Sequence, residues 1–237
     1  MGNGPLLFAL AIFVVLTAFR WHPEPGSQLF NGAWHVKNGS IEEVLILQDG
    51  YLSHTVFDKP NKKFVSTYGG IYKAGGKLMV EFDTRSTDEI GKQIDFDAQL
   101  VGQKLISKTN RHAQSWTRID EGKEILAGVW RITGRMVDGK VNEMTRGDRK
   151  TLKILSGTRF QWVAINPATK EFFGTGGGVY TFSDGKYSEH IEFFSRDSSR
   201  VGASLTFDGS VKDDIWNHSG RSSKGEPLNE FWSKEKN

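Results

Sequence analysis

The sequence predicts an all-β protein made of two tandem up-and-down antiparallel β-barrels of about eight strands each, after a separate N-terminal segment. Three observations lead to this fold class. Short runs of alternating apolar and polar residues are separated by turn residues, as at Ser183–Lys186 (SDGK). No window shows a convincing 3.6-residue period, which excludes amphipathic helices from most of the chain. The sequence also repeats itself, and each copy has the length that an eight-stranded barrel requires.

The repeat is visible in three pairs of segments. They are Leu29–Lys37 (LFNGAWHVK) with Leu126–Thr133 (LAGVWRIT), Phe64–Tyr72 (FVSTYGGIY) with Phe172–Tyr180 (FFGTGGGVY), and Ile90–Asp97 (IGKQIDFD) with Val201–Asp208 (VGASLTFD). Trp116 and Trp232 lie near the ends of the two copies. We therefore expect a first barrel within residues 28–122 and a second within residues 123–237.

Residues 1–27 are interpreted as a signal peptide or a membrane anchor followed by a linker. Leu6–Phe19 (LLFALAIFVVLTAF) is an unbroken apolar run, short for a membrane span and typical of the centre of a signal peptide. The linker His22–Ser27 (HPEPGS) separates it from the repeat, which disfavours a buried core helix. The sequence thus predicts export to the periplasm or the medium, or anchoring at the outer side of the membrane through residues 6–19. Whether the segment is cleaved stays open.

Composition narrows the classes of partner. The net charge is +3 with both signs interspersed, so a nucleic-acid partner is not expected. The absence of cysteine excludes disulfides and cysteine-ligated metals. His190 and Glu192 share a strand face at a spacing that could chelate a metal, but no third ligand is evident, so neither a metal nor a cofactor is expected.

In the second copy the alternating runs predict eight strands. A polar stretch follows the first of these strands. The turn Asn166–Lys170 (NPATK) separates the third strand from the fourth, and the Asp-Gly turn of SDGK separates the fourth strand from the fifth. The expected strands span 127–137, 150–156, 159–165, 171–182, 186–194, 201–208, 211–218 and 227–234.

A Gly-x-Trp motif opens each copy, as Gly32–Trp34 and Gly128–Trp130. Near the end of each copy a basic residue stands two positions after a tryptophan, as Arg118 after Trp116 and Lys234 after Trp232. With the meander of strands, this resembles the lipocalin-like (calycin) barrels, and the second copy is similar to lipocalin-like domains of exported bacterial proteins. The resemblance implies that each first-strand tryptophan closes a barrel end against a basic residue, Arg118 for Trp34 and Lys234 for Trp130. It also implies a general ligand-binding role, without naming a ligand or catalytic residues.

The glycines of the segment GTGGG, residues 174–178, do not form a phosphate loop, because strand and turn residues follow where a helix is needed. The first copy serves as an internal comparison. Gly176 stands where that copy has Tyr68, and alignment on the Gly-Lys dipeptides places Glu189 opposite Val80. Both changes indicate a roomier and more polar interior in the second barrel, unless the glycines serve only barrel closure.

The first barrel is therefore interpreted as the degenerate, structural copy and the second as the ligand site. The expected lining or rim residues are Trp162, Gly176, Tyr187, Glu189, Trp216, His218 and Glu230, with the segment from Ile215 to Gly225 at the rim. A small, partly apolar ligand is the expected partner. Two alternatives stay open: an enzyme using Glu189 and His218 as acid and base, or a protein-interaction module without a cavity.

Overall fold

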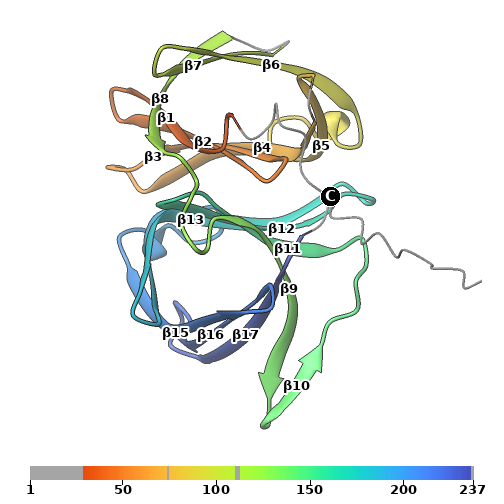
Figure 1. Ribbon diagram of the computed structural model, residues 1–237, viewed down its shortest axis with the longest axis vertical. Coiled ribbons are helices and arrows are strands. Elements are labelled where there is room, and N and C mark those ends of the chain that lie inside the picture. The colour runs from red at the N-terminus through yellow and green to blue at the C-terminus, as the bar shows by residue number, and fades with distance from the viewer. Residues whose placement is uncertain (1–28, 74, 110–112, 236–237) are drawn as a thin grey trace, which may run out of the picture.

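The computed structural model describes residues 29–73, 75–109 and 113–235, and these fold into two closed barrels that lie against each other (Figure 1). The predicted fold class, all-β with two tandem eight-stranded antiparallel barrels, is confirmed. The predicted signal or anchor segment lies outside the described residues. Within the three described ranges, no helix has the length and apolar character that crossing a membrane requires.

The first barrel is an up-and-down meander that closes through pairing of its first and last strands. A single 3₁₀ turn, Thr87–Glu89, separates its fifth and sixth strands. The strands are β1 (Gly32–Asn38), β2 (Ile41–Gln48), β3 (Tyr51–Asp58), β4 (Lys63–Lys73), β5 (Lys77–Asp83), β6 (Gln93–Val101), β7 (Lys104–Thr109) and β8 (Ala113–Asp120).

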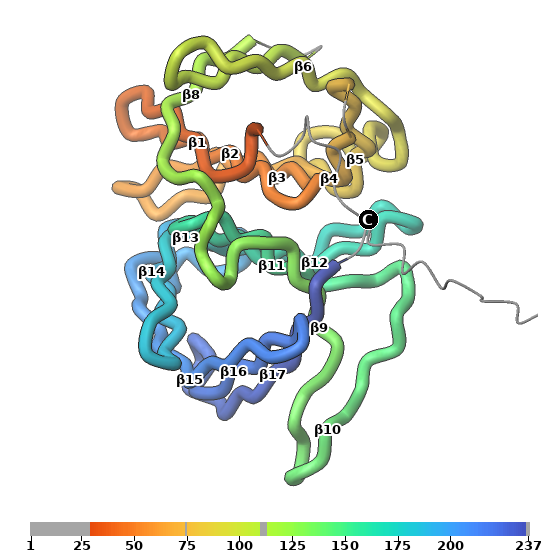
Figure 2. Tube along the Cα trace, in the orientation of Figure 1, coloured from red at the N-terminus to blue at the C-terminus, as the bar shows by residue number. Residues whose placement is uncertain are grey.

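The second barrel repeats this order and closes through pairing of β9 with β17. A 3₁₀ turn, Ser198–Arg200, again separates its fifth and sixth barrel strands. Its strands are β9 (Gly128–Val137), β11 (Lys150–Leu155), β12 (Arg159–Asn166), β13 (Glu171–Ser183), β14 (Lys186–Phe194), β15 (Ser204–Lys212), β16 (Ile215–Arg221) and β17 (Pro227–Lys234). Figure 2 shows the two rings of strands in sequence order, the first in red to green and the second in green to blue.

An extra strand, β10 (Lys140–Glu143), was not predicted. It pairs only with the outer half of β9, and the two form an arm that projects from the second barrel (Figure 1). The arm turns at Asp138 and Gly139, which both have positive φ angles of 51° and 74°. That pair of angles is typical of a type I′ hairpin turn, which Asp-Gly favours.

Each barrel has its own apolar core, because alternate side chains of every strand point inward. The first core is built around Trp34, Leu45, Leu78, Phe96 and Trp116. The second is more aromatic and contains Trp130, Phe160, Tyr180, Tyr187, Phe207, Trp216 and Trp232.

A third apolar cluster joins the two barrels. It is formed by side chains on the outer faces of strands from both copies, among them Val44 and Phe57 from the first and Ile154, Val163 and Phe193 from the second. All of these residues are buried, as the residues inside the barrels are. The outer face of each barrel on this side is therefore buried in the interface, and the two barrels form one packed body.

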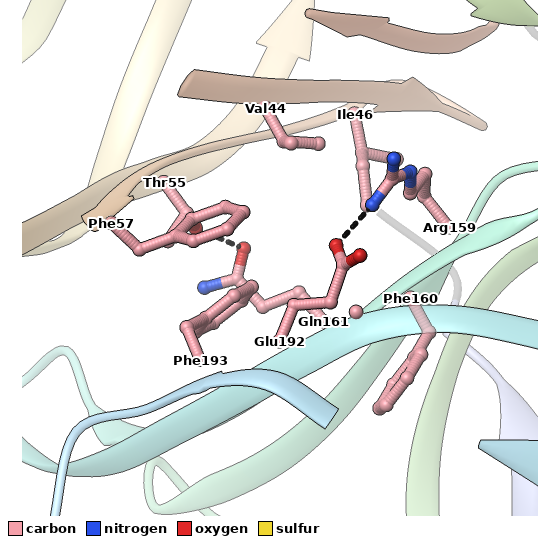
Figure 3. Close-up of a pocket in the computed structure, with 10 residues that line it drawn as sticks. Val44, Ile46, Thr55, Phe57, Arg159, Phe160, Gln161, Glu192 and Phe193 are labelled. Atoms are coloured by element: carbon pink, nitrogen blue, oxygen red, sulfur yellow. Dashed lines mark hydrogen bonds and ion pairs between the residues drawn. The ribbon is translucent and has the colours of Figure 1, made fainter. Parts of the chain in front are cut away.

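Gln161 on β12 lies at the centre of this interface and bonds to both barrels (Figure 3). Its Oε1 accepts hydrogen bonds from Thr55 Oγ1 at 2.8 Å and from Ser53, and its Nε2 donates to Thr67 Oγ1 at 3.0 Å and Thr175 Oγ1 at 2.9 Å. The amide thus uses both donor hydrogens and both acceptor sites. The cavity beside it measures only about 10 Å³, about the space of one water molecule.

Ionic contacts surround the apolar cluster. Glu192 of the second barrel pairs with Lys59 of the first at 2.6 Å. It also pairs with Arg159 of its own barrel (Figure 3). Lys150 pairs with Glu81 at 2.7 Å. Hydrogen bonds from Gly157 and its neighbours hold the pKa of the Asp120 carboxyl below its ordinary value, against the opposing effect of burial. These contacts fix the orientation of one barrel on the other.

Candidate functional site

Seven large aromatic side chains surround the axis of the second barrel, and most of them contact Trp216 on β16 or Tyr187 on β14. The Tyr187 ring meets Trp216 edge-on at 4.8 Å between centroids, and Trp216 meets Trp130 at 5.7 Å. Tyr187 and Trp216 are both fully buried. The sequence placed Trp216 at a barrel rim, but the residue begins an inward-facing row on β16 and lies in the interior instead.

A buried ion pair crosses this aromatic interior. Lys153 on β11 contacts the carboxylate of Glu189 on β14, with 2.7 Å between Nζ and Oε1, and each side chain is only 7% exposed. The Tyr187 hydroxyl donates to the same oxygen at 2.7 Å. The Lys153 ammonium also lies over the rings of Tyr187, Trp216 and Trp232, 4.8 to 5.4 Å from their centroids. Ring faces and carboxylate together replace the hydration that the ammonium loses.

A second polar chain runs from the interior to the surface. His218 on β16 contacts Glu230 on β17, with 3.2 Å between Nε2 and Oε2, and Arg135 on β9 contacts the other oxygen of Glu230 at 3.0 Å. Burial, and then the nearby Lys153, hold the pKa of His218 below its ordinary value. Although burial opposes it, the hydrogen bond with His218 and the charge of Lys153 hold the pKa of Glu230 below its ordinary value. The imidazole is thus neutral and donates from Nε2 to the ionised carboxylate.

Three buried nitrogen atoms of this cluster have no hydrogen-bond partner among the described residues: Trp216 Nε1, Trp232 Nε1 and His218 Nδ1. The indole nitrogens are donors, and Nδ1 of the neutral imidazole is an acceptor. A buried polar atom without a partner costs about 1–3 kcal/mol. The site therefore offers unused donors and an acceptor among aromatic surfaces, which suits a group that both accepts and donates a hydrogen bond.

The first barrel shows that the fold does not require these groups. Trp34 faces Leu45 across β1 and β2, whereas the equivalent Trp130 faces Lys153. Tyr72 faces Leu78, whereas the equivalent Tyr180 faces Glu189. Two leucines of one barrel thus correspond to the two members of the buried ion pair in the other.

The register corrects one sequence alignment. Glu189 was matched to Val80 through the Gly-Lys dipeptides, but the β13–β14 hairpin is longer than the β4–β5 hairpin, and Leu78 is the true counterpart. Because Leu78 and Val80 share a face, the inward orientation expected for Glu189 is still found. Lys153 was missed, although a lysine inside the apolar run TLKIL, at the position of Leu45 in VLILQ, was a visible signal.

His218 and Glu230 have polar but uncharged counterparts. They face each other across β16 and β17, as Ser107 and Gln114 do across β7 and β8. In the first barrel the Ser107 hydroxyl accepts a hydrogen bond from Trp116 Nε1 at 2.8 Å, whereas Trp232 at the equivalent position has no such partner among the described residues. The second barrel therefore lacks the hydrogen bond that the first barrel makes to its last-strand tryptophan.

Gly176 lies beside Trp162, and the two form a cross-strand pair. A Cβ added at Gly176 would lie 2.7 Å from the Trp162 indole nitrogen, so that indole fills the room left by the glycine. The equivalent pair in the first barrel is His54 with Tyr68. The first barrel thus has a histidine and a tyrosine where the second has a tryptophan and a glycine. Trp162 remains partly exposed.

The two Gly-x-Trp motifs lie at equivalent barrel ends. Arg118 lies over the Trp34 ring at 3.9 Å, and Lys234 lies over the Trp130 ring at 4.5 Å. Both tryptophans donate from Nε1 to the carbonyl four residues earlier. The glycine of the second motif, Gly128, has φ +148°, and a side chain there would collide with Lys234, so the motif needs glycine.

A groove of about 450 Å³ opens at the second barrel, and Arg135 is one of the residues that line it. It lies between β9 and the segment that leads from the arm to β11. Nine described residues line it: Arg131, Ile132, Arg135, Met144, Thr145, Gly147, Arg149, Lys150 and Thr151. The sequence analysis did not identify this groove, because Met144, Thr145, Gly147 and Arg149 come from the polar stretch between the predicted strands 127–137 and 150–156, whose position could not be predicted.

Among residues 29–235, apart from the gaps at 74 and 110–112, no group of three residues is arranged to hold a metal ion. His190 bonds to Ser204 at the surface, whereas Glu192 is buried between the barrels. No model of a known protein family matches the chain, and a search of curated proteins finds no match to its sequence.

Proposed function

We propose that this chain is a lipocalin-like binding protein that acts outside the cytoplasm and holds a small, partly apolar ligand in its second barrel. One observation carries the proposal. The second barrel contains Lys153 and Glu189 where the first contains Leu45 and Leu78. A buried ion pair stabilises a fold less than apolar residues of similar volume often do, so its retention in one copy favours a role in recognition.

The chemistry of the interior indicates the kind of ligand. Aromatic rings would supply most of the contact area, and the unused nitrogens of Trp216, Trp232 and His218 would orient one polar group. A hydroxyl or an amide fits, because each both donates and accepts. Since the interior is closely packed, the ligand must displace a side chain, and Trp162 over Gly176 is the partly exposed member of the aromatic wall.

The test is native mass spectrometry of protein purified from the cells that produce it, compared with the double variant Lys153→Leu/Glu189→Leu. We expect a small molecule on the natural protein and none on the variant, which carries the residues of the first barrel. Its stability should be unchanged or raised by about 1–4 kcal/mol, whereas Lys153→Leu alone should lose about 3–5 kcal/mol by leaving Glu189 unpaired.

The matched control is Lys186→Leu/Asp208→Leu, which removes an exposed ion pair from the same barrel. It should retain the ligand. If both double variants retained the small molecule equally, the barrel interior would not be its binding site. Natural protein that carried no small molecule would favour the alternative of a protein-interaction module. Fractionation of the producing cells tests the location, and intact chain in the soluble cytoplasm would contradict export.

A further inference from the structure

We infer that the groove between β9 and residues 144–151 is a second binding site, for a small organic oxyanion, a carboxylate or a phosphate monoester, that carries a short apolar tail. The inference does not rest on the proposed function, because the groove includes neither Lys153 nor Glu189, although Ile132 also belongs to the barrel core and Arg135 pairs with Glu230. At about 450 Å³ it has the size of small-molecule sites in proteins.

The charge of the groove is one-sided. Four cationic side chains line it, Arg131, Arg135, Arg149 and Lys150, and no carboxylate does so among the described residues. Three of the four cations have a carboxylate partner: Glu235 contacts Arg131 at 3.6 Å, Glu230 contacts Arg135 at 3.0 Å and Glu81 contacts Lys150 at 2.7 Å. These carboxylates hold the cations in place, and Arg149 supplies the charge that has no carboxylate partner among the described residues.

Two of the arginines can receive an anion directly. Arg149 is exposed, its guanidinium lies 4.4 Å from the centroid of the Phe173 ring, and no carboxylate of the described residues forms an ion pair with it. The Arg135 side chain is 56% exposed and bonds Glu230 through Nε and Nη2, which leaves further N–H donors. The planar fork of a guanidinium matches the paired oxygens of a carboxylate or a phosphate.

The third arginine, Arg131, fixes the position of the loop that forms one side of the groove. Arg131 is 8% exposed and donates to the carbonyls of Gly147 at 2.5 Å and Arg149 at 3.3 Å. These bonds tie the loop to β9 and hold Arg149 at the groove. The site is therefore organised before a ligand arrives, which lowers the entropic cost of binding.

Apolar surface in the same groove specifies the rest of the ligand. Ile132 and Met144 line it together with the cations, and methionine adapts to irregular shapes. A free inorganic anion would leave this surface in water, whereas a short alkyl chain would cover it. An oxyanion with a tail of a few carbon atoms uses both parts of the lining.

Isothermal titration calorimetry with hexanoate, hexyl phosphate, inorganic phosphate and hexanol tests the inference on the whole chain. We expect binding of hexanoate or hexyl phosphate, whichever headgroup is preferred, weaker binding of inorganic phosphate, and none of hexanol. Affinity should fall as salt concentration rises. Absence of binding by both hexyl anions would overturn the inference, as would equal binding of hexanol. Equal affinity for inorganic phosphate would overturn the role of the tail.

Variants locate the site. Arg149→Gln and Arg135→Gln should each weaken the preferred anion about tenfold or more, since a charge-assisted hydrogen bond contributes about 1.5–3 kcal/mol. Arg149 is exposed, so that variant should fold normally even if Arg135→Gln does not. Arg85→Gln, an exposed arginine of the first barrel, is the matched control and should bind as the natural protein does.

Unchanged affinity in Arg149→Gln would place the anion elsewhere and overturn the assignment. The double variant Lys153→Leu/Glu189→Leu separates this inference from the proposed function. It should lose the barrel ligand and retain the anion, and loss of both would show that the groove is not an independent site.

Discussion

At the scale of single residues, the comparison of the two copies explains most of the candidate site. Strand alternation was enough to predict that Glu189 points inward, because the face of a residue depends only on its parity along the strand. The partner of that carboxylate could not be predicted with the same ease. Lys153 lies on β11, which does not pair with β14, so its contact with Glu189 crosses the barrel interior and depends on the closed barrel.

The pair Trp162 and Gly176 gives a prediction at this scale. Gly176→Tyr should destabilise the protein by about 1–3 kcal/mol, because the new side chain would overlap the Trp162 indole. Adding Trp162→His should recover part of that loss, since the double variant reproduces His54 and Tyr68 of the first barrel. Urea unfolding of the two single variants and the double variant measures the coupling. Purely additive effects would show that the two side chains do not share one space.

At the scale of strands, the sequence was most informative where one face is buried and the other is not. The observed β9 and β14 match their predicted ranges closely. The strands predicted at 201–208 and 211–218 lie instead at Ser204–Lys212 and Ile215–Arg221, because residues 201–203 connect the 3₁₀ segment to β15 and the hairpin turn falls at Asp213 and Asp214, which have positive φ. β10 was missed because all four of its residues are exposed. A strand without a buried face carries no alternating pattern, so only its pairing with β9 reveals it.

The Gly-x-Trp strands give the prediction at this scale. Trp34→Ala and Trp130→Ala should each lower the free energy of unfolding by about 3–5 kcal/mol, because each removes a fully buried ring at a barrel end. Val137→Ala, at a half-exposed position of the arm, should change it by no more than about 0.5 kcal/mol. Denaturant titration measures both effects. A stable Trp130→Ala protein that had lost only its ligand would contradict the structural role.

At the scale of the molecule, the decisive feature is the core that the two barrels share. The repeat predicted two barrels, but nothing in it predicted how they meet, because the residues of the shared core look like the buried faces of ordinary strands. Gln161, in a strand of alternating apolar residues, is the exception. Its four hydrogen bonds extend into both barrels, so it marks the interface once the structure is known.

We therefore expect the two barrels to unfold together. Differential scanning calorimetry should give a single transition whose calorimetric and van't Hoff enthalpies agree. Ile46→Ala, within the shared cluster, should lower the temperature of that single transition rather than split it. Two resolved transitions in the natural protein would mean that the interface contributes little to stability.

The shared core also affects how the chain is made. When Asp120, the last residue of the first barrel, has been added to the chain, residues 121–237 have still to be synthesised, which takes roughly 6–23 s at the usual elongation rates. During that time Val44, Ile46 and Phe57 lack the residues of the second barrel that cover them, which come from β9 and later strands. A nascent chain that exposes this apolar surface needs a chaperone, or must stay unfolded until its second half has been synthesised. Transport of the unfolded chain across a membrane, which the N-terminal segment predicts, would meet that need by releasing both halves to fold at the same time.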